Sequence, residues 1–202
     1  MGTGNTRGRT EVPDFFKMLV NIKPDTIQIA LERDMKAGAA FKRASIEGGK
    51  GRFYGYLGEE IVKQEIPQFI HCDVKDYDLK FDKYTFDVKT KTRKDAPKPW
   101  FDATVDESAH HQRPDYYIFV QILAPQNLIK MSKDEIRNYK YTTAWILGYL
   151  HRSEFYGTAR HFRAGEIDPS NGIKYRDSIY LVKCSELKSA QVLKDKISKY
   201  VF

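Results

Sequence analysis

Cysteine is scarce in this sequence and long apolar runs are missing, and each absence excludes a class of protein. Only Cys72 and Cys184 occur in 202 residues, and their separation does not match a metal-binding spacing. We therefore expect neither a disulfide scaffold nor a cysteine zinc site, and a reduced, cytoplasmic protein is the simplest interpretation. No run of about 18 apolar residues exists, so no membrane-spanning helix is expected. Residues 1–10 also lack the apolar segment of a secretory signal.

The composition is that of a folded globular chain. Hydrophobic residues make up 41% and charged residues 30% of the sequence, which indicates a packed core rather than disorder. A length of 202 residues favours one domain with an appended arm. We expect a flexible arm over residues 1–24, a helix and a basic loop over 25–52, and a core domain over 53–202. The small size, basic charge and missing targeting signals are typical of a bacterial or phage protein.

Positive charge is in excess and is concentrated in one segment. The formal net charge is +7, a balance that permits a polyanionic partner such as DNA. Between residues 80 and 98, aspartates at 82, 87 and 95 are outnumbered by lysine or arginine at 80, 83, 89, 91, 93, 94 and 98. The excess positive charge therefore lies beside acidic residues whose arrangement suggests a catalytic site.

Apolar periodicity predicts helices and strands in an order typical of a mixed α/β or α+β domain. Phe53, Leu57 and Ile61 recur every four residues and predict a helix that ends near Glu65. The nearly continuous apolar segments 115–123 and 142–150 predict buried strands. The other expected elements are a helix over 25–45, a weak strand over 69–74, a hairpin over 77–91, a short helix over 106–113, a strand over 178–183 and a helix over 185–200. This order predicts a mixed sheet flanked by helices.

The hairpin over residues 77–91 carries the most informative side chains. Asp78 belongs to its first strand, and Asp87 and Lys89 belong to its second. Because side chains alternate along a strand, Asp87 and Lys89 share one face while Phe86 and Val88 share the other. Two carboxylates about 4 Å apart repel by roughly 4 kcal/mol at an effective dielectric of about 20, and a divalent cation offsets this repulsion. The pattern therefore predicts a Mg²⁺ or Mn²⁺ site beside an ammonium group, which suits phosphodiester cleavage.

The same residues resemble the signature of the PD-(D/E)xK nucleases, the restriction-endonuclease-like superfamily. That signature is a glutamate on a helix, an aspartate that opens the second core strand, and an acid-x-Lys on the third. Here the helix is the segment 55–62, the aspartate is Asp78, and the acid-x-Lys is Asp87-Val88-Lys89. Tyr77 stands where the family usually has proline, and the strand over 115–123 fits the fourth core strand. The resemblance covers roughly residues 53–123.

The resemblance implies a restriction-endonuclease-like mixed central sheet and a metal-dependent DNA nuclease, with an endonuclease favoured. It implies that Mg²⁺ or Mn²⁺ would be held by Asp78, Asp87, the Val88 carbonyl and Glu59. Lys89 would lie near the attacking water or the charge that develops on the phosphate. Cleavage of both strands of a duplex would favour a homodimer, for which residues 1–45 are the natural contact region.

Two neighbouring acids compete for the helix position of this site. Glu59 has Val62 and Ile66 three and seven residues further on, a spacing that places it at the border of a buried face. We favour Glu59 as the site residue, and Glu60 is the open alternative.

Several basic residues are candidate phosphate contacts: Lys91, Arg93, Lys94, Lys50 and Arg52. Each of them could equally be a solvated surface charge. Together with Tyr54, Tyr56 and Trp100 they could line a basic, aromatic groove. The roles of His110, His111 and Gln112, which precede the strand over 115–123, stay open between a structural role and the orientation of water or phosphate.

Three other functions are compatible with the sequence. A non-catalytic nucleic-acid-binding protein could keep the same fold, and an exonuclease or junction resolvase could use the same site. Alternatively, Asp78, Asp87 and Lys89 could be a solvated ion-pair ribbon on an exposed hairpin. The sequence contains no recognisable base-reading element, so the specificity for a nucleic acid cannot be read from it.

Overall fold

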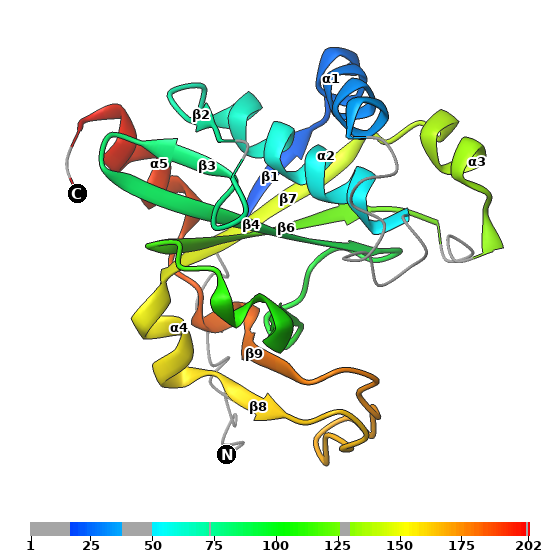
Figure 1. The fold of residues 1–202 in the computed structure, drawn as a ribbon, viewed down its shortest axis with the longest axis vertical. Helices are drawn as coiled ribbons and strands as arrows, with labels where there is room; N and C mark the ends of the chain where they lie inside the picture. The colour runs from blue at the N-terminus through cyan, green and yellow to red at the C-terminus, as the bar shows by residue number, and fades with distance from the viewer. Residues whose placement is uncertain (1–16, 38–49, 73, 126–129, 201) are drawn as a thin grey trace, which may run out of the picture.

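In the computed structural model of the protein, residues 17–37, 50–72, 74–125, 130–200 and 202 are described. The centre is a six-stranded sheet in the order β1-β7-β6-β4-β3-β2 (Figure 1). β4 runs parallel to β6, and the other neighbouring strands are antiparallel, so the sheet is mixed. Its strands are β1 (Met18–Asn21), β2 (Ile70–His71), β3 (Leu79–Phe81), β4 (Tyr84–Arg93), β6 (Tyr116–Leu123) and β7 (Thr143–His151).

A smaller sheet in the order β5-β9-β8 lies on one side of the central sheet, and two helices cover the other side (Figure 1). Its strands are β5 (Asp102–Asp106), β8 (Arg160–Phe162) and β9 (Ile179–Lys183). The two covering helices are α1 (Pro24–Lys36) and α2 (Lys50–Glu65). The remaining helices are α3 (Lys133–Asn138), α4 (Arg152–Thr158), α5 (Ala190–Ser198) and the 3₁₀ turns η2 (Glu107–His111) and η4 (Cys184–Glu186). None of the described helices has both the length and the apolar character needed to cross a bilayer.

Two apolar clusters fill the space on the two sides of the central sheet. Phe86 and Val88 pack into the cluster beneath α2, whereas Tyr117 and Phe119 pack into the cluster beneath the small sheet. β6 contributes to both clusters because alternate side chains point to opposite faces. The buried character predicted for the strands over 115–123 and 142–150 is confirmed.

The fold class predicted from the sequence, a mixed sheet flanked by helices, is confirmed, while several element boundaries differ. Residues 18–21, expected in a flexible arm, form β1 and pair with β7. The helix expected over 25–45 ends at Lys36, and residues 38–49 lie outside the described part. The helix expected over 185–200 is divided into η4 and α5, because the Ser189 side chain caps a new helix start. β5 and β8 were not predicted, since such short edge strands carry little periodic signal.

Candidate active site beside the β3–β4 hairpin

The tight turn between β3 and β4 sets the register of the hairpin. Phe81 pairs with Tyr84, so only Asp82 and Lys83 form the turn, and Asp82 has a φ of 52°. Aspartate tolerates this left-handed conformation better than most residues do. The ladder runs back to Leu79 and Phe86, after which β4 continues to Arg93 beside β6. The residues of the acid-x-Lys motif therefore follow directly after the point where β3 and β4 separate.

Asp78 bridges this separation with both its backbone and its side chain. Its backbone N–H donates to the Phe86 carbonyl at 2.9 Å, and its Oδ2 accepts from the Val88 backbone N–H at 2.7 Å. The N–H and C=O of one strand residue point to the same edge. The Val88 carbonyl therefore faces the edge of β4 where the Asp78 carboxylate lies.

Asp87 and Lys89 lie on the opposite face of β4 from Phe86 and Val88, as the alternation predicts. Asp87 is only 3% exposed, and its Oδ2 lies 2.6 Å from Lys89 Nζ. Lys89 Nζ also donates to Gln112 Oε1 at 3.2 Å, and Gln112 Nε2 in turn donates to the Lys75 carbonyl at 2.8 Å. Because the carboxylate is buried, the ion pair is not the solvated surface ribbon that the sequence left open.

Glu59 and Glu60 are both buried, and they share two positively polarised partners. Arg33 on α1 reaches Glu59 Oε2 at 2.7 Å and Glu60 Oε1 at 2.9 Å. His71 on β2 places Nε2 at 2.8 Å from Glu60 Oε1 and Nδ1 at 3.6 Å from Glu59 Oε2. α1, α2 and β2 therefore meet at this pair of acids.

The electrostatics separate the two glutamates. Burial raises the pKa of Glu59 to about 7 against the opposing effect of Arg33, and the charges of Glu60 and Asp87 add to the rise. Burial also raises the pKa of Asp78 well above its usual range, together with the charges of Asp87 and Glu59. The pKa of Glu60 is lowered, because His71 and Arg33 outweigh its burial. The charges of Glu60 and Asp87 therefore act on Glu59, whereas His71 and Arg33 act on Glu60.

The carboxylate oxygens of this cluster suit a hard divalent cation, although Lys89 and Arg33 now balance their negative charge. Asp87 Oδ2 and Glu59 Oε2 are buried and accept no hydrogen bond of good geometry from the described residues. Mg²⁺ and Mn²⁺ prefer such carboxylate oxygens. Among the described residues, however, no three acidic, histidine or cysteine side chains form a preassembled metal site. Cation binding would therefore compete with Lys89 for Asp87 and with Arg33 for Glu59.

Two of the candidate phosphate contacts are engaged inside the protein. Arg52 Nε lies 2.6 Å from Asp34 Oδ1, and Arg137 NH2 lies 2.6 Å from Asp34 Oδ2, so Asp34 joins α1 to α2 through Arg52 and to α3 through Arg137. Lys91 Nζ lies 3.4 Å from the Asp102 carbonyl of β5, and burial lowers its pKa to about 8. These contacts give Arg52 and Lys91 structural positions and remove them from the proposed phosphate contacts.

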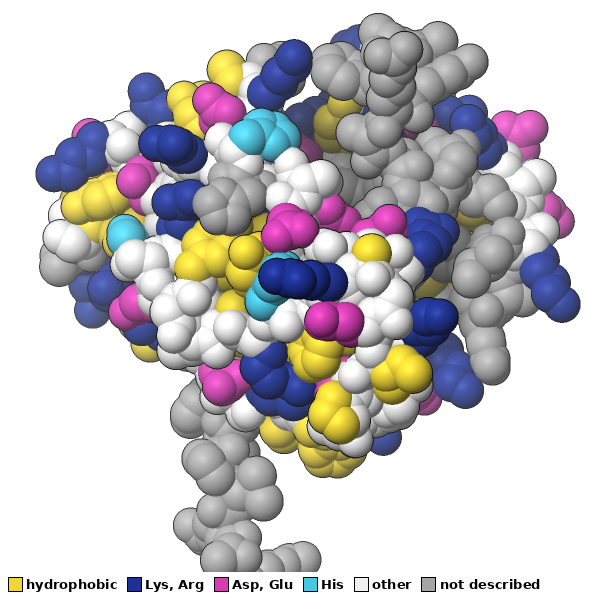
Figure 2. Space-filling model, turned by 60° about the horizontal axis from the view of Figure 1, so that its bottom comes forward, with side chains coloured by type: hydrophobic (Ala, Val, Ile, Leu, Met, Phe, Trp, Pro, Cys, Tyr) yellow, Lys and Arg dark blue, Asp and Glu magenta, His cyan; other side chains and the backbone are white. Residues whose placement is uncertain are grey.

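The other basic candidates lie near the ends of α2 and β4. The Arg93 guanidinium stacks over the Phe101 ring at 4.3 Å, and Lys94 directly follows β4. Lys50 is the first residue of α2, and its side chain lies outside the described part. Figure 2 shows that the described Lys and Arg side chains on the face drawn are interleaved with acidic and apolar ones. On this face, positive charge is thus distributed rather than gathered into one patch.

Of the three residues before β6, Gln112 lies at the site through its contact with Lys89. His111 Nδ1 lies 2.7 Å from the Ser108 carbonyl within η2, which is a local structural contact. The side chain of His110 lies outside the described part.

Sequence reasoning missed Arg33 and His71. Arg33 lies 26 positions before Glu59 on a separate helix, and His71 lies on a two-residue strand. The only available signal was the need of two adjacent buried acids for compensating charge. This requirement does not identify which basic residue of the chain supplies the compensating charge.

Comparison with known proteins adds no further constraint, because no family model, curated protein or solved structure matches this chain.

Proposed function

We propose that the protein is a metal-dependent deoxyribonuclease that hydrolyses internal phosphodiester bonds. The observation that carries this proposal is the interaction of the buried Asp87 with the partly buried Asp78, with an ammonium group beside them. Burial and the charge of Asp87 raise the pKa of Asp78, and Lys89 Nζ lies 2.6 Å from Asp87. Buried groups with perturbed pKa values in such an arrangement are typical of functional sites.

The order of elements around the site supports the proposal. α2 carries Glu59, β2 follows, Asp78 directly precedes β3, and Asp87 and Lys89 lie on β4. The next strand of the central sheet along the chain is β6, which is buried and parallel to β4. This is the order that the resemblance to the restriction-endonuclease-like nucleases implies.

In the proposed reaction, the acidic residues would hold the cation and the lysine would act on the phosphate. Asp78, Asp87, the Val88 carbonyl and Glu59 would supply the ligands for Mg²⁺ or Mn²⁺. When bound, such an ion polarises a phosphate oxygen and makes water more acidic. The Lys89 ammonium would stabilise the negative charge that develops on the phosphate. Gln112 would orient Lys89, since its Oε1 already accepts from Nζ.

The proposal is tested by two substitutions that keep side-chain volume, Asp87→Asn and Lys89→Met. With plasmid, linear, single-stranded and branched DNA in Mg²⁺, we expect each to reduce cleavage by at least about 100-fold. DNA affinity and the circular dichroism spectrum should stay close to those of the unmodified protein. Lys80→Met, on the exposed face of β3, is the matched control and should cleave normally. Magnesium-dependent cleavage that survives in both site variants would refute the nuclease assignment.

A non-catalytic DNA-binding protein on this fold is the second candidate. It is favoured by one observation, the absence of a preassembled three-ligand group among the described residues. In that case all of the DNAs would be bound in a salt-dependent manner and none would be cleaved at any Mg²⁺ or Mn²⁺ concentration. The substrate panel also separates an endonuclease from an exonuclease or a junction resolvase.

A further inference from the structure

A large aromatic side chain is exposed on the connection between β4 and β5. Trp100 is 63% exposed, whereas the other tryptophan, Trp145, is 7% exposed and belongs to the core. Tryptophan is enriched at binding surfaces, where its ring supplies a large apolar contact area. The connection begins directly after β4, the strand that carries Asp87 and Lys89.

The backbone of this connection is fixed rather than loose. Four hydrogen bonds from three other parts of the chain hold residues 95–101: Gln121 Nε2 to Asp95 O (2.8 Å), Lys17 Nζ to Pro97 O (2.9 Å), Ser185 N to Pro99 O (3.0 Å) and Cys184 N to Phe101 O (2.7 Å). A fifth, from Phe101 N to Lys98 O (3.0 Å), lies within the connection. A fixed backbone that still exposes an indole has already lost the conformational entropy that binding would otherwise cost. The connection is therefore preorganised for a ligand.

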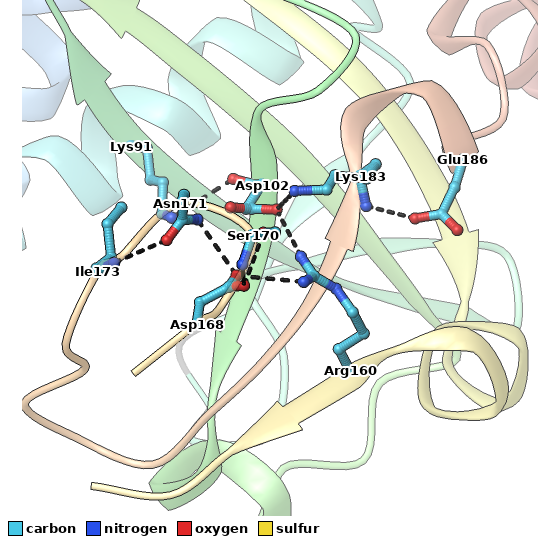
Figure 3. Close-up of polar contacts among 9 residues, drawn as sticks. All are labelled: Lys91, Asp102, Arg160, Asp168, Ser170, Asn171, Ile173, Lys183 and Glu186. Atoms are coloured by element: carbon cyan, nitrogen blue, oxygen red, sulfur yellow. Dashed lines mark hydrogen bonds and ion pairs between the residues drawn. The ribbon is translucent and has the colours of Figure 1, made fainter. Parts of the chain in front are cut away.

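The residue after the connection is also anchored, as Figure 3 shows. Asp102 Oδ1 lies 2.8 Å from Lys183 Nζ and 3.3 Å from Arg160 NH2. The same Arg160 reaches the buried Asp168 at 3.2 Å, and Lys91 Nζ lies 3.4 Å from the Asp102 carbonyl (Figure 3). This network ties the start of β5 to β4, β8 and β9, so Trp100 is held in a defined place relative to β4.

Cations accompany the exposed ring. Lys98 Nζ lies 5.5 Å from the centre of the Trp100 ring and 5.9 Å from that of Phe101. The Arg93 guanidinium covers Phe101 at 4.3 Å. An aromatic face with ammonium and guanidinium groups beside it matches an unpaired base with its phosphates, because the base stacks and the phosphates pair with the cations. An apolar protein partner would leave the charges of Lys98 and Arg93 without partners.

We propose that Trp100, Lys98 and Arg93 form a stacking platform for an unpaired base of single-stranded DNA that extends from the cleavage site. This inference rests on the proposed nuclease function and assigns the substrate class of the same site. The substrate class is therefore DNA with a single-stranded segment.

Tryptophan fluorescence gives a direct test that does not depend on cleavage. In a Trp145→Phe background, Trp100 is the only fluorophore of its kind, and titration with a 12-nucleotide oligothymidylate in EDTA should quench it. A blunt duplex of the same length should quench it much less. Circular dichroism checks that the Trp145→Phe protein is folded. Absence of quenching by the oligothymidylate in the folded protein overturns the proposal.

A second measurement uses the protein with Trp145 intact. By fluorescence anisotropy of labelled oligothymidylate, Trp100→Ala should weaken binding about tenfold, and Trp100→Phe should restore much of the affinity. Ile167→Ala, which also trims an exposed apolar side chain, is the control and should bind normally. Equal binding by Trp100→Ala and the unmodified protein, or an equal loss on blunt duplex, overturns the platform. Because no metal is present, loss of nuclease activity in Asp87→Asn leaves this result unaffected, so the two proposals fail separately.

Discussion

The Asp78 carboxylate accepts a hydrogen bond from the Val88 backbone N–H at 2.7 Å, and this bond joins the two halves of the hairpin where their ladder ends. The same carboxylate is partly buried, and this burial together with the charges of Asp87 and Glu59 raises its pKa. Asp78 therefore has two separable properties, a hydrogen-bond acceptor that supports the fold and a negative charge that the fold disfavours.

Asp78→Asn should separate these properties, because asparagine keeps an acceptor oxygen and removes the charge. We expect its free energy of unfolding at pH 8 to equal or exceed that of the unmodified protein, while magnesium-dependent cleavage is lost. Asp78→Ala leaves the Val88 N–H without its acceptor and should be destabilised by about 1–3 kcal/mol. Urea unfolding and a cleavage assay on the same samples measure both effects. If Asp78→Asn cleaves DNA normally, Asp78 is not a metal ligand.

Arg33 should be essential to the stability of the pair Glu59 and Glu60. Arg33→Met leaves two buried carboxylates with less compensation, and we expect a loss of about 2–3 kcal/mol at pH 7, given that Arg33 is partly exposed. The loss should shrink towards pH 5, because Glu59, whose pKa is about 7, accepts a proton over this range. Millimolar Mg²⁺ should also stabilise Arg33→Met more than the unmodified protein, because it competes with Arg33 for Glu59.

Urea unfolding with and without Mg²⁺ measures these effects of Arg33→Met. Lys194→Met is the matched control, since it removes a partly exposed ion pair with Glu65 at 3.2 Å and should cost less than about 1 kcal/mol. An equal response to Mg²⁺ in Arg33→Met and the unmodified protein would show that the cation does not compete at Glu59.

The hairpin could be predicted from the sequence because its signals are local. Asp87 and Lys89 are two residues apart, so the alternation of a strand alone puts them on one face. The mixed sheet was predictable for the same reason, since β6 and β7 are long, apolar and β-branched or aromatic.

The partners of the site could not be predicted, because they come from distant parts of the chain. Arg33 reaches Glu59 from a different helix, and Lys91 contacts a strand that periodicity did not reveal. Alternation along β4 puts Lys91 on the same face as Lys89, but it does not show that the small sheet covers the position of Lys91. The charge balance of a buried acid depends on tertiary contacts, and these leave no periodic trace in the sequence.

The stability of the protein should rise with pH through the pKa of Lys91. Burial lowers the folded-state pKa of Lys91 to about 8 from an ordinary value of 10.5. Between these values the unfolded state binds more protons, so the contribution of Lys91 to the free energy of unfolding increases with pH. Below pH 8 the folded protein carries the full penalty of a buried charge, up to about 3 kcal/mol.

Lys91→Met should remove this penalty and raise the free energy of unfolding at pH 7 by up to about 3 kcal/mol. The gain over the unmodified protein should decline between pH 8 and pH 10.5, as the two unfolding curves converge. Urea unfolding at several pH values gives the difference directly, and Lys80→Met, at the exposed position of β3, is the matched control. A constant difference across this range would contradict a buried, easily deprotonated Lys91.

The contact between α2 and β4 should be intolerant of a single methyl group at Gly58. A Cβ built at Gly58 would lie 1.9 Å from Thr90 Oγ1 and 3.1 Å from Thr90 Cγ2, so the helix would have to move away from the strand. We expect Gly58→Ala to cost about 1–3 kcal/mol despite the better helix propensity of alanine. Since Glu59 is the next residue, metal-dependent cleavage should fall as well.

Gly55→Ala provides the matched control on the same helix, because no atom lies within 4 Å of a Cβ built there. It should stabilise the protein by roughly 0.5–1 kcal/mol through helix propensity alone and leave cleavage unchanged. The double variant Gly58→Ala/Thr90→Ala should recover part of the stability lost in Gly58→Ala, since it removes Thr90 Oγ1, the atom that the new methyl group would meet at 1.9 Å, together with Cγ2. Urea unfolding of the three variants tests the contact. If Gly58→Ala is as stable as Gly55→Ala, α2 does not pack against Thr90 at this distance, and the placement of Glu59 beside the aspartates fails with it.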